Sequence, residues 1–487
     1  MSAVAAEGSY TYGTLINGVW VSEGRAFATY NPACPDQQVG HYRESSIAEV
    51  AAVMKAASTA QRAWARVPGL ERQGIVQAFL AKLRGETERI ARAITLEMGK
   101  PLAEARGEVG YSLREAEFMA SEAARPLGHL LPSLRSNMRN MSMRKPRGVI
   151  AAITPWNYPL LTPMRKIAPA LTFGNSIVLK PSEFTPATAC IVADLARGIL
   201  PDGLLGIVLG QAAVGQALVS HPLVDAVTFT GSVATGRSIY KLAAQSLAEV
   251  SLELGGKNPI VIHDTDDLDA CLNEAVTGAL VNAGQRCTAI SRVLVRRGLA
   301  ADVEAGLAER MRAVVVGNGF DERTRIGPLA MKAQLEKVNA MVENGVAQGA
   351  RICAGGERLA PAGFASGYFM APTLLCGVTP GMTVAREEIF GPVLSVLPYE
   401  TIDEALDMVN DVQFGLSASL FSNDQRVVHR FIDHANAGML HINNQTATDP
   451  NMPFIGMKDS GVGACSVGQG SANFYTSESA VYLRYGS

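Results

Sequence analysis

The stretch NAGQRCTAIS, residues 282–291, places one cysteine, Cys287, beside Arg286 within a run of small residues. A thiol in this setting could be a nucleophile, a metal ligand, half of a disulfide or a small core residue. The six other cysteines are scattered along the chain and form no CxxC pair. This spacing argues against a disulfide framework and against a zinc cluster, so no metal site is expected. The residues around Cys287 alone leave its role open.

Two further polar residues interrupt apolar segments. Glu253 lies in LELGGK, residues 252–257, and is followed by two glycines. A carboxylate at the end of an apolar strand suits a general base, although a paired structural glutamate would fit equally well. Asn157 lies in PWNYP, residues 155–159. Its amide could donate to a developing oxyanion, or the motif could form only a turn.

Loops rich in glycine and charge follow other apolar segments. FTGSVATG, residues 229–236, joins an expected strand to an expected helix, where glycine lets the backbone approach a phosphate at the helix N-terminus. Its spacing is not that of GxGxxG, so a plain strand-to-helix turn is an equal alternative. LKPSE, residues 179–183, places Lys180 and Glu183 where ligands bind in open α/β sheets. Taken alone, an exposed charged loop is the simpler interpretation.

An alternation of strands and helices must position these residues. The helical spacing of apolar residues predicts helices over 47–64, 70–98, 186–200 and 232–245. Apolar runs predict strands over 148–154, 176–180, 204–210, 226–231 and 249–256, and a second strand-and-helix series from about residue 258 to 422. Short buried strands separated by helices predict parallel sheets covered on both faces, so the fold class is α/β.

Three other segments look like strands outside this series. Residues 13–21 predict a hairpin with Asn17 and Gly18 at its turn. Residues 139–148 and 480–485 predict strands that belong to neither sheet. Strands with spare edges are candidates for pairing between subunits.

The composition narrows the possible function classes. The chain has 487 residues, of which 48% are hydrophobic and 18% charged, and this is ordinary for a compact protein of several domains. The net charge of -2, without a basic stripe, argues against a nucleic-acid partner. Residues 1–13 lack the features of a secretory signal and are expected to form a flexible tail. No uncharged apolar stretch is long enough for a membrane span, so a cytoplasmic location is expected.

Seven motifs, taken in order, resemble those of the aldehyde dehydrogenase superfamily. They are PWNYP, LKPSE, FTGSVATG, LELGGK, GQRC, EEIFGPV and PF.G.K.SG, and the resemblance extends over nearly the whole chain. It implies a Rossmann-like cofactor domain (1–124 and 147–255), an α/β catalytic domain (256–469) and a small β oligomerisation domain (125–146 and 470–487). It also implies a homodimer or homotetramer that acts on a small-molecule aldehyde.

The resemblance also assigns roles to residues. Cys287 becomes the nucleophile, and Asn157 with the Cys287 backbone N–H receives the oxyanion. Glu253 becomes the base that activates water. The cofactor would be NAD, with NADP possible, because Glu183 near the ribose should repel a 2′-phosphate. The residues implied for cofactor binding are Trp156, Lys180, Ser182, Glu183, Gly231, Ser232, Gly236, Glu387 and Phe390.

One departure from the family pattern bears on the mechanism, and two arginines bear on the substrate. Many relatives carry an acidic residue in the loop that here reads GACSVGQG, residues 463–470, so the hydrolytic base is assigned to Glu253 alone. Arg165 and Arg286 are candidates for binding the distal anion of a short aldehyde of the succinic, 2-oxoglutaric or sulfonated semialdehyde type. Alternatively, Arg165 pairs with an acid or a helix-end carbonyl and does not contact the substrate. The alternatives are a neutral aldehyde substrate, an acylating coenzyme A-dependent enzyme and a non-catalytic binding protein.

Overall fold

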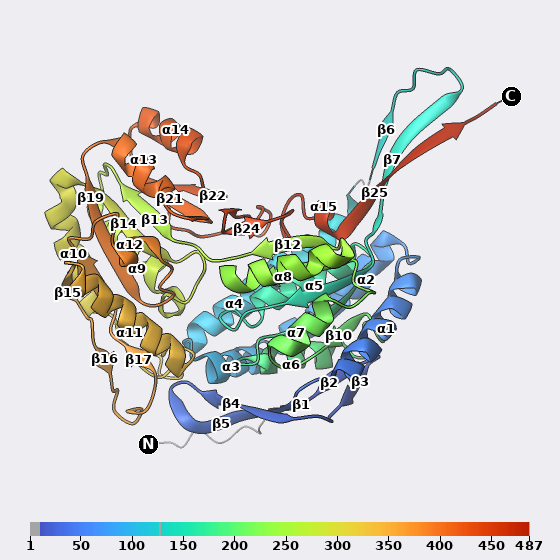
Figure 1. Ribbon diagram of the computed structural model, residues 1–487, viewed down its shortest axis with the longest axis horizontal. Helices are drawn as coiled ribbons and strands as arrows, with labels where there is room; N and C mark the ends of the chain where they lie inside the picture. Colours follow the sequence, from blue (N-terminus) through green and yellow to red (C-terminus); the bar gives the residue numbers. More distant parts are fainter. Residues whose placement is uncertain (1–9, 126–127, 487) are drawn as a thin grey trace.

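Two large sheets lie on opposite sides of the molecule in the computed structural model, which describes residues 10–125 and 128–486 (Figure 1). Of the predicted tail, residues 1–9 lie outside this range. Residues 10–12 contradict the tail prediction, because they form β1 (Tyr10–Tyr12), which pairs in parallel with β5 (Cys34–Arg43). β4 (Ala26–Asn31) completes that three-stranded sheet. No helix among the described residues is long and apolar enough to cross a bilayer.

The first large sheet has eight strands in the order β24-β12-β11-β8-β9-β10-β2-β3. Its five central strands are parallel, and β2, β3 and β24 are antiparallel additions at the edges. The predicted strands and the hairpin are confirmed. Their bounds are β2 (Thr14–Ile16), β3 (Val19–Val21), β8 (Val149–Ile153), β9 (Ser176–Lys180), β10 (Leu205–Ile207), β11 (Ala226–Thr230), β12 (Glu249–Glu253) and β24 (Gly461–Val462).

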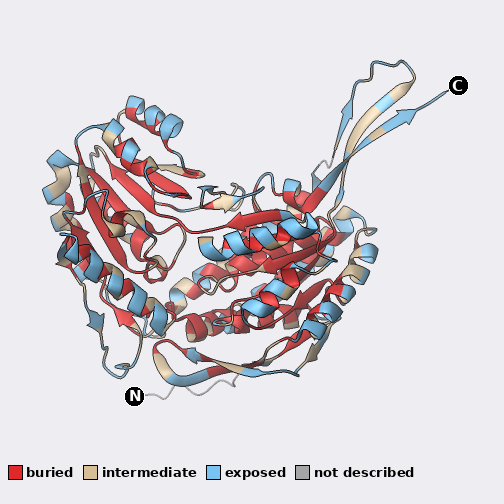
Figure 2. Cartoon of the chain, in the orientation of Figure 1, coloured by how far each residue is buried: buried red, intermediate tan, exposed pale blue. Residues whose placement is uncertain are grey.

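Helices cover both faces of this sheet, as the continuous apolar strands predict. Ile150 and Ala152 of β8 pack in one core, and Val149 and Ala151 pack in another on the opposite face. One core includes α2 (Gly69–Gly85), α3 (Thr87–Met98), α4 (Leu102–Ser121), α5 (Leu161–Thr172) and α6 (Pro186–Ala196). The other includes α1 (Ile47–Trp64), α7 (Ala212–Val219) and α8 (Val233–Ser246). Figure 2 shows buried strands between helices whose outer sides are exposed.

Several helix boundaries differ from the sequence prediction. The single helical region expected over 70–98 is divided into α2 and α3, because Glu86 between them leaves the helical conformation (φ -107°, ψ 17°). The helix expected over 186–200 ends at Ala196, since Arg197 is extended. The helix α4 was not predicted. It begins directly after Pro101 and contributes residues to the site described below.

The second large sheet has seven strands in the order β15-β18-β19-β14-β13-β21-β22. The predicted second series is confirmed in β13 (Asn258–Ile262), β14 (Ile290–Arg296), β19 (Val393–Tyr399) and β21 (Ser417–Phe421). The other strands are β15 (Arg351–Ala354), β18 (Thr373–Cys376) and β22 (Met439–Ile442). The main helices of this series are α9 (Leu268–Leu280), α10 (Ala300–Arg312), α11 (Lys332–Ala347), α13 (Ile402–Asn410) and α14 (Gln425–His434).

A third sheet projects away from both large sheets (Figure 1). It consists of β6 (Gly128–Leu131), β7 (Met138–Pro146) and β25 (Thr476–Arg484) in the order β25-β7-β6. The two predicted outlying strands are therefore confirmed and pair with each other, with Ala480 opposite Ser142. The remaining short elements are β16 (Arg358–Leu359), β17 (Phe369–Met370), α12 (Thr383–Arg386), β20 (Phe414–Gly415), β23 (Met457–Lys458) and α15 (Ala472–Tyr475).

Candidate active site

A cavity of about 560 Å³ collects the residues on which the sequence analysis depends. Its lining includes Cys287, Asn157 and Glu253. Asn157 and Glu253 meet because β8 and β12 are parallel members of one sheet, so their carboxyl ends lie at the same edge. Cys287 comes from the segment before β14 of the other large sheet. The lining also contains residues predicted for the cofactor and the substrate: Trp156, Gly231, Ser232, Phe390, Arg165 and Arg286.

Cys287 follows a short stretch of unusual backbone. Asn282, Ala283 and Gly284 all have positive φ angles, of 58°, 54° and 70°. Such angles are costly for residues other than glycine and persist only where the surroundings hold them. The Asn282 backbone N–H donates to the Glu104 carboxylate at 3.0 Å, and its side-chain amide donates to the Asn157 carbonyl at 2.9 Å. The backbone before Cys287 is thus fixed from two sides.

The thiol of Cys287 is partly buried within the cavity. Burial raises its pKa to about 11, and the nearby positive charges of Arg286 and Arg165 oppose this rise. The thiol is therefore largely protonated at neutral pH in the free protein, and it needs a base or a bound ligand to become a thiolate.

Asn157 is held in place by its backbone and by its side chain. Its carbonyl accepts from the Lys100 ammonium at 3.0 Å, and its side-chain amide donates to the Gln285 carbonyl at 2.9 Å. Lys100 is itself buried and paired with Glu108 at 2.6 Å. A side-chain amide nitrogen carries two N–H groups, so the second remains for a ligand in the cavity. This arrangement suits a fixed donor to an oxyanion.

Glu253 ends β12 and is 5% exposed. One carboxylate oxygen accepts from the Thr230 hydroxyl at 3.1 Å, and the other accepts from the Ser466 hydroxyl. Ser466 lies in the loop 463–470, which was noted for its lack of an acidic residue. The sequence analysis missed Ser466, because no sequence pattern links it to a residue 213 positions away.

Gly255 and Gly256 let the backbone pass close to the Glu388 carboxylate and the Cys287 carbonyl. A Cβ atom at Gly256 would lie 2.6 Å from the Cys287 carbonyl oxygen, and one at Gly255 would collide with the Glu388 carboxylate. The Gly256 N–H donates to Glu388 at 3.0 Å. The glycine pair of LELGGK is thus explained by close packing, which no larger residue could permit.

Part of the predicted cofactor set lines the cavity, and part lies beside it. Trp156 and Phe390 meet edge-to-face with ring centroids 5.5 Å apart, and Phe390 has a positive φ of 59°. Ser232 caps α8 by accepting from the Thr235 N–H at 3.3 Å. Lys180, Ser182, Glu183 and Gly236 do not line the cavity. Lys180 ends β9, which is hydrogen-bonded to β8, and Ser182 and Glu183 follow directly.

The structure places Glu388, and not Glu387, at the cavity. Glu387 is exposed, whereas Glu388 lines the cavity and accepts from the Gly256 N–H. Burial raises the pKa of Glu388. The sequence could not separate two adjacent glutamates, because the segment before β19 has no regular period that would show which one points inward.

Both predicted substrate arginines line the cavity, but they have partners within the protein. Arg165 forms two hydrogen bonds with the Glu115 carboxylate, at 2.8 and 3.0 Å, and its guanidinium lies 4.3 Å from the centre of the Phe454 ring. Arg286 donates to the Thr446 carbonyl at 2.5 Å, and no ion pair engages it within residues 10–125 and 128–486. The positive charge of Arg165 is therefore neutralised by the Glu115 carboxylate, whereas Arg286 is hydrogen-bonded to a neutral carbonyl group.

Comparisons with known proteins agree over nearly the full length. The sequence profile of the aldehyde dehydrogenase family matches residues 20–481. The chain is 37% identical over 479 residues to an alpha-ketoglutaric semialdehyde dehydrogenase of Bacillus subtilis (strain 168), covering 97% of this chain and 98% of that protein. It is 38% identical over 452 residues to a betaine aldehyde dehydrogenase of Cereibacter sphaeroides (strain ATCC 17029 / ATH 2.4.9), covering 92% of each.

A solved structure extends this agreement to three dimensions. Betaine aldehyde dehydrogenase from Staphylococcus aureus in complex with NAD+ superimposes with a TM-score of 0.94 at 32% identity, covering 97% of this chain and 95% of that one. The shared fold and the family match together resolve the question raised by the motifs. The chain belongs to the aldehyde dehydrogenase family.

Proposed function

We propose that this chain oxidises an aldehyde to a carboxylic acid with NAD+ or NADP+ as oxidant. One observation carries the proposal: Cys287, Asn157 and Glu253 line a single cavity together with Trp156 and Phe390. Spectrophotometric detection of NADH formation over a panel of aldehydes tests it. Absence of NADH or NADPH with every aldehyde would contradict it.

The chain's own residues supply the covalent chemistry. The Cys287 thiol releases its proton to solvent, and the sulfur bonds to the aldehyde carbon. The carbonyl oxygen becomes an oxyanion that accepts from the Asn157 amide and the Cys287 N–H. The bound nicotinamide ring supplies the oxidation by accepting hydride from this carbon. Glu253 then takes a proton from water, the resulting hydroxide adds to the thioester, and the sulfur leaves as thiolate.

The residues beside the cavity fit a dinucleotide. Lys180 is 5% exposed, and its ammonium contacts the Pro181 carbonyl at 3.3 Å and Glu183 at 3.6 Å. An ammonium and a carboxylate at a strand end match the donors and acceptors of a ribose diol. Glu183 should repel a 2′-phosphate, which favours NAD over NADP. Glu183→Ala is expected to shift the ratio of kcat/KM values toward NADP, and an unchanged ratio would contradict this role.

Glu388 takes the second ribose in this proposal, in place of Glu387. It lines the same cavity as Trp156 and Phe390, whereas Glu387 is exposed. Glu388→Gln should therefore raise KM for the dinucleotide or lower kcat, and Glu387→Gln serves as the matched control. Equal effects of the two substitutions would contradict the assignment.

For the substrate, we infer an aldehyde that carries a distal carboxylate. Arg286 is a cavity cation with no ion-pair partner in the described part of the chain, and the relative from Bacillus subtilis is named for a semialdehyde. A trimethylammonium group, as in betaine aldehyde, would need open aromatic faces. Two of the candidate faces are already covered, because Arg165 lies over Phe454 and Lys100 lies 3.9 Å from the centre of the Tyr158 ring. These contacts favour the anionic substrate over the cationic one.

The substrate inference is tested by comparing three aldehydes of similar length. Succinic semialdehyde should exceed both betaine aldehyde and butanal in kcat/KM. Arg286→Gln should lower the value for the semialdehyde by about 10- to 100-fold, since a hydrogen bond to a charged group contributes about 1.5–3 kcal/mol. Butanal should respond much less. An equal loss for butanal would show that Arg286 acts on the nucleophile and not on the distal group.

A further inference from the structure

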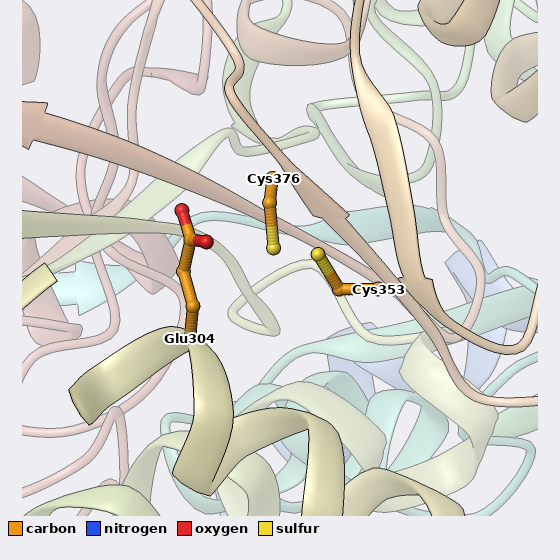
Figure 3. Close-up of side chains that lie close together, drawn as sticks. All are labelled: Glu304, Cys353 and Cys376. Carbon is orange, nitrogen blue, oxygen red and sulfur yellow. The ribbon is translucent and has the colours of Figure 1, made fainter. Parts of the chain in front are cut away.

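Three potential metal ligands meet at the edge of the second large sheet, remote in sequence from the motifs of the active site. They are Glu304 of α10, Cys353 of β15 and Cys376 of β18, and their ligand atoms all lie within 4.8 Å of one another. Figure 3 shows the two cysteine side chains directed toward the same space, which Glu304 reaches from its helix. None of the three lines the catalytic cavity.

We propose that Glu304, Cys353 and Cys376 form a binding site for a soft divalent cation of the zinc and cadmium type. The site is separate from the proposed aldehyde chemistry. The sequence analysis argued against a zinc cluster because the cysteines are scattered along the chain and form no CxxC pair. In the fold, however, β15 pairs with β18, and this pairing brings Cys353 and Cys376 together.

A bulge in the strand pair explains why the two thiols meet. β15 and β18 are antiparallel, with Arg351 opposite Cys376 and Ile352 opposite Leu375. The register shifts between Ile352 and Ala354, which makes Cys353 the extra residue of the bulge. A bulge redirects its side chain, and here the Cys353 thiol joins Cys376 on the side that faces α10.

The donor atoms and their separations fit zinc better than a hard cation. Zinc binds cysteine sulfur at about 2.3 Å and carboxylate oxygen at about 2.0–2.2 Å, so tetrahedral donors lie about 3.4–3.8 Å apart. The present limit of 4.8 Å requires shifts of about 1 Å. Thiolates select soft metals, whereas calcium and magnesium require oxygen ligands. The fourth position is left for water, since Glu304 and Cys353 are only partly buried.

The Arg351 guanidinium contacts two of the three proposed ligands, so a metal ion would compete with it. Its guanidinium lies 3.2 Å from the Glu304 carboxylate and 3.8 Å from the Cys353 sulfur. The Glu304 oxygen and the Cys353 sulfur therefore already contact a cationic group, which shows that positive charge is favourable at this position. The Arg351 side chain is 66% exposed, so it can move into solvent, and an exposed ion pair contributes only about 0–1 kcal/mol. Arg351 therefore competes with the metal without blocking it.

Cadmium titration tests the site, because cadmium–thiolate bonds absorb in the ultraviolet. The background is Cys287→Ser, which removes the catalytic thiol from the measurement. This protein should bind one cadmium ion per chain, and zinc should displace it. Cys353→Ser should weaken binding by about tenfold or more, as expected for loss of one of three ligands. Cys34→Ser is the matched control, since Cys34 is also a partly buried free thiol and should change nothing.

Two further variants separate this site from non-specific thiol binding. Glu304→Gln should weaken cadmium binding, and Arg351→Ala should strengthen it by removing the competing cation. Zinc should also raise the Tm of the Cys287→Ser protein. It should leave unchanged the Tm of the double variant that carries both Cys287→Ser and Cys353→Ser. A cadmium signal unaffected by Cys353→Ser, or weakened by Arg351→Ala, would overturn the proposal. None of these readouts depends on aldehyde oxidation, so failure here leaves the proposed function untouched.

Discussion

At the scale of single residues, the proposed nucleophile is the Cys287 thiol, whose pKa is raised by burial. The pKa of Cys287 is raised to about 11, although two arginines oppose the rise. The proposed base for hydrolysis, Glu253, has its two oxygens oriented by Thr230 and Ser466. A serine of the loop 463–470 thus contacts the proposed base.

Removing the base should separate the two halves of the reaction. Glu253→Gln is expected to lower steady-state kcat by about 10²–10⁴-fold, the usual contribution of a general base. An initial burst of NADH should remain, because hydride transfer precedes hydrolysis. Stopped-flow absorbance measures both. Ser466→Ala keeps the carboxylate and loses only one hydrogen bond to it, so its loss of kcat should be smaller. Unchanged steady-state turnover in Glu253→Gln would refute the assignment.

The raised pKa of the Glu104 carboxyl group predicts that the stability of the fold depends on pH. The pKa of Glu104 is raised to about 7, chiefly by burial. A group whose pKa is raised on folding stabilises the folded state fully below its unfolded value of 4.5, and this contribution is lost as pH rises through 7. Glu104→Gln imitates the protonated form and can still accept from the Asn282 N–H.

The measurement is Tm between pH 4.5 and 8 for the wild type and Glu104→Gln. Relative to the variant, the wild type should lose Tm as pH rises across this range. A difference in Tm that is constant with pH would show that Glu104 does not titrate in this way.

At the scale of elements, parallel strands bring the site together and the loops after them provide its chemistry. The strands were predictable because their apolar runs are continuous. The motifs also predicted that Asn157, Glu253 and Cys287 share one site, and all three line the same cavity, while their catalytic roles stay a prediction. The partners of these residues were not predictable. Glu115 meets Arg165 from 50 residues away, and only the packing of α4 against α5 brings them together. β1 was missed because three residues give no period and its stability comes from pairing with β5.

The turn after β12 should tolerate no side chain at Gly256. Gly256→Ala would push a methyl group against the Cys287 carbonyl, which lies 2.6 Å from the position of the new Cβ. We expect kcat to fall by about tenfold or more, since small displacements of a reacting group are costly. Gly74→Ala is the control: Gly74 lies within α2 with nothing within 4 Å of a new Cβ, so stability should rise by up to about 1 kcal/mol. Full activity of Gly256→Ala would contradict this packing argument.

At the scale of the whole molecule, the projecting sheet β25-β7-β6 is a candidate surface for association between copies of the chain. Its edge strands β6 and β25 expose apolar side chains, including Leu130, Leu131, Tyr482 and Leu483. Exposed apolar edge strands are a liability in a monomer, so we infer that a second copy of the chain covers them. The pairing of subunits through this sheet remains a prediction.

Charges placed on this sheet should disrupt association. Leu131→Asp combined with Tyr482→Asp is expected to reduce the mass measured by light scattering toward that of a single chain. Both residues are at least 50% exposed in the chain alone, so the fold itself should survive, as circular dichroism would verify. An unchanged oligomer would show that the subunits associate elsewhere.

The central claim is that Cys287 carries the substrate as a covalent thioester. Its most direct test is mass spectrometry of Glu253→Gln, quenched in acid after mixing with NAD+ and an aldehyde that is a substrate. The account predicts an added acyl group on the peptide that contains Cys287, and no such adduct in Cys287→Ala. An adduct on another cysteine, or NADH formation that persists in Cys287→Ala, would contradict it.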